Sequence, residues 1–135
     1  MIEGRKFIDK VKEYFSFLID EFDFSIIDEQ IQGNVFYKLK YKNEKRELAI
    51  SINYENIEDY FQVIAFKLQN GKMPDYDDKT KTLHLNKLTE LLFPKVSKNE
   101  IEANNEYFSK FEAKDELHRK LLKSAKELRL LLKHL

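Results

Sequence analysis

The sequence predicts an α+β fold: an N-terminal amphipathic helix, a four-stranded antiparallel meander in the order 1-2-3-4, and two to three C-terminal helices. Apolar residues recur at helical spacing near the start, and consecutive stretches between residues 24 and 68 read as strands joined by turn residues. Leucines spaced by three and four residues dominate the C-terminal region. The length of 135 residues fits a single domain over residues 1–135.

Residues 6–22 are predicted to form one amphipathic helix. Its apolar positions follow the spacing of one helix face, which the sheet is expected to cover. These positions are Phe7, Ile8, Val11, Phe15, Leu18, Ile19 and Phe22. Residues 1–5 are expected to be a tag remnant or disordered, because residues 2–5 resemble the recognition sequence of a processing protease used to remove fusion tags.

The first strand is expected at 24–31, followed by a tight turn around Gly33. A three-residue loop with Gly33 near the left-handed conformation places apolar residues opposite apolar ones and unlike charges opposite each other, which a two-residue Gly-Asn turn does not. The expected pairs are Ile31 with Val35, Ile27 with Leu39 and Asp28 with Lys38.

The next two strands, 35–42 and 46–54, alternate between apolar and polar residues. A two-residue loop pairs Leu39 with Leu48, whereas a four-residue loop keeps the faces matched but shifts each partner by two. Either loop gives a hairpin with one face toward the core and one toward water, which is typical of an antiparallel sheet covered on one side.

The fourth strand, 60–68, has apolar residues on both faces. It is therefore expected either to be buried on both sides or to offer an apolar strip to a partner. The stretch 69–83 has no clear pattern and is expected to be a loop, either functional or mobile.

The C-terminal region is expected to begin with a short helix at 85–93. Its inward positions are expected to be Leu85, Leu88, Leu91 and Leu92. A capping box of Ser97 and Glu100 then starts the helices of 98–135. One straight helix over that range would be about 55 Å long. A break near 112–116 is therefore favoured over a single projecting helix, which stays the alternative.

Composition excludes several classes of function. The 24 basic and 24 acidic residues cancel, so no net charge draws the chain to nucleic acid or to a membrane. The absence of cysteine excludes disulfides and thiolate catalysis and suits a cytoplasmic protein. No membrane span and no signal peptide are expected.

No motif indicates a cofactor, a metal site or a catalytic residue. The acidic group Asp75, Asp77 and Asp78 lacks the glycine and the closing glutamate of a calcium loop. The three histidines lie far apart in sequence, without metal-ligand spacing. Neither a nucleophile elbow nor a glycine-rich phosphate loop is present.

Two charged surfaces are candidate sites. Lys38, Lys40 and Lys42 form a basic row on the outward sheet face, which supports a nucleic-acid binder as one alternative. Cross-strand charge pairing explains the same row without a function. Asp20, Glu21 and Asp23 form an acidic patch at the end of the first helix, a surface that suits a basic partner.

These features favour a small intracellular module that binds another protein or self-associates through its C-terminal helix. The candidate interface is Tyr60, Phe61, Val63, Leu121, Leu128, Leu131 and Leu135. In its layout of elements the chain resembles small bacterial immunity-type proteins, and that resemblance implies occlusion of a partner, such as a toxin. An enzyme with a carboxylate, histidine or tyrosine site assembled by the fold stays an alternative.

Overall fold

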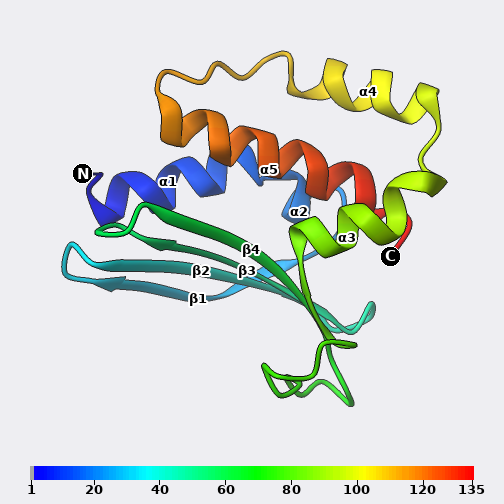
Figure 1. Cartoon of the computed structure of the whole chain (residues 1–135), viewed down its shortest axis with the longest axis horizontal. Coiled ribbons are helices and arrows are strands. Elements are labelled where there is room, and N and C mark those ends of the chain that lie inside the picture. The colour runs from blue at the N-terminus through cyan, green and yellow to red at the C-terminus, as the bar shows by residue number, and fades with distance from the viewer. Residues whose placement is uncertain (1) are drawn as a thin grey trace. The chain divides into compact units, whose positions relative to one another are not determined.

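The computed structural model describes residues 2–135 and confirms an α+β fold with an antiparallel sheet and C-terminal helices (Figure 1). The chain divides into two compact units, one ending at His84 and one from Leu85 to Leu135. The single domain expected from the length stays a prediction.

Unit 1 is built on a five-stranded antiparallel sheet in the order β1-β2-β3-β4-β5. The strands are β1 (Ser25–Gln32), β2 (Phe36–Asn43), β3 (Leu48–Glu55), β4 (Tyr60–Lys67) and β5 (Thr82–His84). The meander order is confirmed, but the prediction of four strands was wrong. The extra strand, β5, begins at the end of the predicted loop 69–83 and pairs with β4. Its three residues are too few to show an alternating pattern.

The β1–β2 hairpin has the expected three-residue loop, and Gly33 adopts the expected left-handed conformation with φ of 53°. The predicted pairs were nevertheless wrong by two positions, because Ile31 lies opposite Tyr37 and Asp28 opposite Lys40. Val35 belongs to the loop, since its N–H donates to the Gln32 carbonyl and its carbonyl accepts from outside the hairpin.

The β2–β3 hairpin has a four-residue turn, 44–47, which is one of the two loop lengths expected. Apolar faces stay matched, but neither expected register is present: Leu39 lies opposite Ile52, four positions from the Leu48 of a two-residue loop and two from the partner expected with a four-residue loop. Asn43 explains the shift. Its buried side chain donates to the Phe22 carbonyl at 2.7 Å and accepts from the Arg46 N–H at 3.0 Å, which keeps Asn43 inside the strand.

The predicted single helix over 6–22 was wrong, since α1 (Gly4–Tyr14) and the short α2 (Phe17–Asp20) are separate. The N–H of Leu18 bonds to the Phe15 carbonyl, three residues back, and tightens the chain between the two helices. The break turns Phe17 into the core and leaves Ile19 exposed.

Helix α1 lies along one face of the sheet (Figure 1). The Phe7 ring centroid lies 5.6 Å from that of Tyr37 and 5.3 Å from that of Tyr54. Alternate residues of β2 and β3 complete this buried layer, and they include the paired Leu39 and Ile52. Burial of these aromatic and branched side chains supplies the main stabilisation of the unit.

The second side of β4 is buried only toward its C-terminal half. Ile64, Phe66, Ala49 and Leu68 form an apolar cluster there. Thr82, opposite Phe66, donates its hydroxyl to the Asp75 carbonyl at 3.1 Å. The loop between β4 and β5 therefore returns to this side of the sheet.

Unit 2 contains α3 (Leu85–Leu92), a 3-10 turn η1 (Phe93–Lys95), α4 (Lys98–Phe108) and α5 (Glu116–Leu132). The favoured break within 98–135 is present, between α4 and α5. The expected inward position of Leu91 was wrong, because this side chain is exposed. None of the helices in residues 2–135 combines the length and the hydropathy that a membrane crossing requires.

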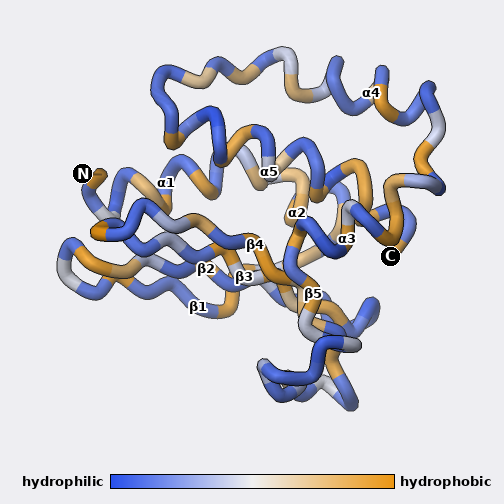
Figure 2. The backbone as a smooth tube through the Cα atoms, viewed as in Figure 1, coloured by the Kyte–Doolittle hydropathy of each residue, from blue (hydrophilic) through white to orange (hydrophobic). Residues whose placement is uncertain are grey.

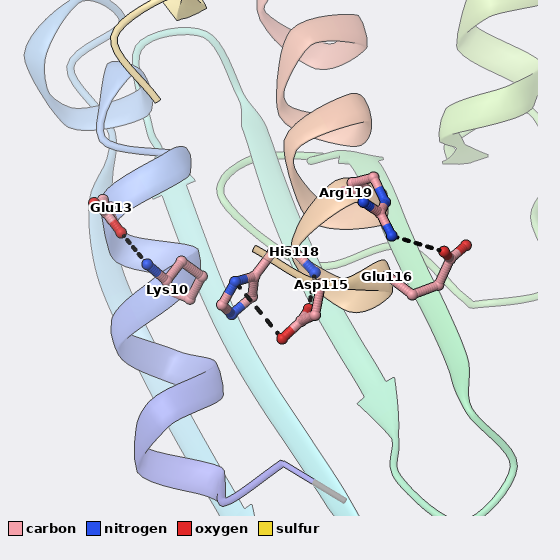
Figure 3. Close-up of polar contacts among 6 residues, drawn as sticks. All are labelled: Lys10, Glu13, Asp115, Glu116, His118 and Arg119. Atoms are coloured by element: carbon pink, nitrogen blue, oxygen red, sulfur yellow. Dashed lines mark hydrogen bonds and ion pairs between the residues drawn. The ribbon is translucent and has the colours of Figure 1, made fainter. Parts of the chain in front are cut away.

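Side-chain caps and a buried amide organise the helices of unit 2. Ser97 caps α4 as predicted, and Asp115 caps α5 by accepting from the His118 N–H at 2.8 Å (Figure 3). Asn104 of α4 donates to the Lys126 carbonyl of α5 at 2.9 Å and accepts from Arg129 at 2.8 Å. This amide joins α4 to α5.

Candidate functional site: the apolar end of the sheet

Four residues with exposed apolar side chains belong to the segments that meet at one end of the sheet: the β1–β2 hairpin, the β3–β4 hairpin and the start of the chain. We call these four residues the apolar end: Ile31 (45% exposed), Val35 (50%), Ile57 (66%) and Tyr60 (51%). Ile31 lies in the row of Tyr37 and Tyr54, on the face that α1 covers, whereas Tyr60 lies in the row of Glu55 and Phe36, on the other face. Figure 2 shows hydrophobic segments at these turns, beside the N-terminus. Single exposed apolar residues are ordinary on a protein surface, whereas a group of them marks a candidate interaction site.

Asn56 holds the segments of the apolar end together. Its backbone N–H donates to the Val35 carbonyl at 2.8 Å. Its side-chain Nδ2 lies within hydrogen-bond distance of the carbonyl oxygens of Ile2 (3.2 Å) and Asn34 (2.9 Å) and of the Tyr37 hydroxyl (3.1 Å). One buried amide thus joins the 56–59 turn to both other segments, so the surface is organised before any partner arrives.

The start of the chain is part of this end. The Tyr37 hydroxyl donates to the Ile2 carbonyl at 2.8 Å, and Gly4 begins α1. A Cβ added at Gly4 would lie 2.5 Å from a methyl carbon of Ile31, so only glycine lets the helix approach β1 this closely. Whether residues 2–5 are a tag remnant stays a prediction, but their backbone supports Ile31 and Tyr37.

A second tyrosine anchors the 56–59 turn. The Tyr54 hydroxyl donates to Asp59 Oδ1 at 2.6 Å, and Asp59 has a positive φ of 50°. Burial, followed by the hydrogen bond to Asp59, raises the pKa of Tyr54 above its ordinary range. Tyr54 therefore stays protonated at neutral pH. Its hydrogen bond fixes Asp59, the residue directly before Tyr60.

The predicted interface residues differ in how far their side chains are buried. Tyr60 is exposed and belongs to the apolar end, Phe61 and Leu135 are half-buried, and Val63 is buried. The remaining predicted positions, all buried, are Leu121, Leu128 and Leu131. Partner binding or self-association through this set stays a prediction.

The predicted acidic patch, Asp20, Glu21 and Asp23, is exposed around the end of α2. Asp23 adopts a positive φ of 63° where the chain turns toward β1. These residues lie outside the apolar end, and binding of a basic partner by them stays a prediction.

The lysine row is engaged in local pairs. Lys38 Nζ lies 3.6 Å from Asp28, and Lys42 Nζ lies 3.6 Å from Glu44. Burial, followed by the charge of Lys38, lowers the pKa of Lys40. All three lysines are half-buried on the face opposite the buried aromatics, and Lys38 has the cross-strand pairing expected of a charged sheet face. Nucleic-acid binding by it stays a prediction.

Three carboxylates have lowered pKa values because neighbours donate hydrogen bonds to them. Lys12 is the main cause for Glu29, Thr80 for Asp78, and His134 for Glu100. All three are ionised at neutral pH. Within residues 2–135 no group of three or more histidines or carboxylates is placed to hold a metal ion.

Local ion pairs occur on helix surfaces in both units, such as Lys10 with Glu13 at 2.7 Å and Arg119 with Glu116 at 3.5 Å (Figure 3). Exposed pairs of this kind contribute little to stability. They are spaced three residues apart on one helix, which is the geometry of ordinary helix-surface contacts.

Sequence reasoning missed Ile31, Val35, Ile57 and Asn56. One local signal was available, since Ile57 is the only apolar residue of the polar connection 55–59. The meeting of the three segments is set by long-range hydrogen bonds, which no local pattern shows.

No protein-family model, no curated protein and no solved structure matches this chain.

Proposed function

We propose that this protein acts by binding another protein through the apolar end. The proposal keeps the mode expected from the sequence, occlusion of a partner, and places the occluding surface at Ile31, Val35, Ile57 and Tyr60. Exposed apolar groups on a rigid frame are the usual centre of such a surface, since partner contact removes them from water.

The observation that carries the proposal is a contrast between two similar turns. The 44–47 and 56–59 turns each join neighbouring antiparallel strands through four residues, and each ends on a residue of positive φ, 51° at Glu47 and 50° at Asp59. The first turn is formed by four charged residues. The geometry therefore does not require an apolar side chain at Ile57, which is nevertheless the most exposed of the large apolar residues described.

The frame around these side chains favours binding. Asn56 and Tyr37 fix the backbone of the three segments, and Tyr54 fixes the last residue of the 56–59 turn. A surface that is already ordered loses little conformational entropy when it binds. The apolar end is thus better suited to a partner than a mobile loop of the same composition.

A photo-crosslinking amino acid placed at position 57 tests the proposal in the cells that make the protein. We expect an adduct of discrete mass, identified by mass spectrometry, because the partner covers Ile57. The second variant carries the crosslinker at position 45, the matching second position of the 44–47 turn. This control makes the other turn equally apolar. It therefore distinguishes an adduct specific to position 57 from an adduct that any exposed crosslinker would form.

Adding Val35→Asp to the position-57 variant is expected to remove the adduct, since a charge beside Ile57 is unfavourable in an apolar contact. Identical adducts from positions 57 and 45 contradict the proposal. An adduct from position 57 that survives Val35→Asp also contradicts it.

A further inference from the structure

The apolar end is bordered by acidic residues. Glu3, Glu55, Glu58 and Asp59 are all exposed. The strand and loop segment 30–37 contains no charged residue, and segment 50–66 contains only the acidic Glu55, Glu58 and Asp59. In a chain whose formal net charge is zero, this border is therefore locally one-sided.

Most of these carboxylates are not neutralised within the protein. Among the residues described, no ion pair joins Glu3, Glu55 or Glu58 to a basic side chain. This differs from β1, where Asp28 lies near Lys38 and Glu29 accepts from Lys12.

The basic residues at the start of α1 offset this border only in part. Arg5 lies 3.3 Å from Asp9 and 3.5 Å from Glu29, so carboxylates of α1 and β1 already balance its charge. Lys6 is exposed and is the other basic residue of this first turn. Glu3, Glu55 and Glu58 against Lys6 leave the border negative.

We infer that the protein bound at the apolar end presents an apolar side chain flanked by lysine or arginine, which meets Ile57 at the centre and Glu55 and Glu58 at the border. This inference rests on the proposed function. An apolar centre with a charged rim is the common arrangement of protein interfaces, and complementary rim charges raise the association rate and select the partner.

Selection of random twelve-residue peptides displayed on phage tests the inference. On the wild-type protein we expect enrichment of peptides that combine apolar residues with a net positive charge. On the double variant Glu55→Lys with Glu58→Lys we expect enrichment of acidic peptides. A synthetic wild-type-selected peptide is expected to bind that variant about tenfold more weakly at low salt, and less so at high salt, where screening reduces the rim contribution.

Two controls separate this inference from the proposed function. The variant Asp20→Lys with Asp23→Lys reverses as many charges at the acidic patch near α2, and it is expected to keep the preference for basic peptides. The variant Ile57→Lys is expected to lose the peptides.

If the enriched peptides are apolar without a charge preference, and Ile57→Lys abolishes their binding, the inference of a basic partner is overturned. The proposed function then still stands. Peptides that Ile57→Lys does not affect, or no enriched peptide at all, count against both. If the purified protein self-associates and the double variant Glu55→Lys with Glu58→Lys does not, the inference is overturned. The partner is then a second copy of the protein.

Discussion

The 44–47 and 56–59 turns join adjacent strands in the same way, yet their surfaces have opposite chemistry. A buried asparagine supports each turn, Asn43 just before the first and Asn56 at the start of the second. Both turns also end on a residue of positive φ. The shared features are those that a tight connection needs, whereas the side chain that faces solvent at the second position, Lys45 or Ile57, is not set by the turn.

This comparison separates structure from function. Features common to both turns are expected to affect stability when changed, and features found at only one turn are expected to affect binding or the packing specific to that end.

Gly4→Val is expected to lower the free energy of unfolding by about 3 kcal/mol, because its Cβ would meet Ile31 at 2.5 Å. Urea unfolding followed by circular dichroism measures the change. Lys6→Val, at an exposed position of the same helix turn, is the matched control and is expected to change stability by less than about 0.5 kcal/mol. Equal effects of the two substitutions would show that the start of α1 is not packed against β1.

Asn56→Ala is expected to cost about 2 kcal/mol, since the Asn34 and Ile2 carbonyls lose a buried donor. Asn43→Ala is expected to cost a similar amount, because it removes the bonds to Phe22 and Arg46. Urea unfolding compares the two variants directly. Only Asn56→Ala is expected to weaken crosslinking from position 57. An equal loss with Asn43→Ala would show that crosslinking depends on the stability of the protein and not on the structure of the apolar end.

The pH dependence of stability is expected to include a contribution from Glu29, whose pKa is lowered from its ordinary value of 4.5, chiefly by the hydrogen bond from Lys12. A carboxylate with a lowered folded-state pKa stabilises the protein fully above its unfolded-state pKa. That contribution is lost as the pH falls from about 4.5 through the lowered value. Unfolding measured between pH 6 and pH 3 in the wild type and in Lys12→Met is expected to show a shallower acid loss in the variant, and parallel curves would contradict the assignment.

Ile57→Lys is expected to change the free energy of unfolding by less than about 0.5 kcal/mol, because the other turn carries lysine at the matching position. The reciprocal Lys45→Ile is expected to be equally small in its effect on stability. Urea unfolding of both variants checks this prediction. A loss above about 1 kcal/mol for Ile57→Lys alone would show that Ile57 is a packing residue of the fold.

Local patterns in the sequence were sufficient for most of the fold. Alternation located β2 and β3, a run of residues apolar on both faces located β4, and the Ser97–Glu100 pattern located the start of α4. Registers were not predictable in the same way. Matching the apolar faces of two strands excludes a register shift by one residue but allows shifts by two or four. The hydrogen bond between Asn43 and Phe22, which selects the register of β2 and β3, is not visible in the sequence.

The candidate site was less predictable than the fold. Tyr60 was identified from an apolar pattern, but Ile57 stands alone among polar neighbours and Val35 was assigned to the strand 35–42. Only the hydrogen bonds of Asn56 bring them together. The break between α1 and α2 was missed for a related reason, because the spacing of apolar residues alone is also compatible with one continuous helix.

The affinity of the Ile57→Lys variant for the partner shows whether the protein binds through Ile57. The free energy of unfolding of this variant is first shown to equal that of the wild type. The partner identified by crosslinking from position 57 is titrated with purified wild-type protein, Ile57→Lys and Lys45→Ile. We expect that Ile57→Lys alone loses at least tenfold in affinity, the effect expected of a central apolar contact. Unchanged affinity for Ile57→Lys would contradict it.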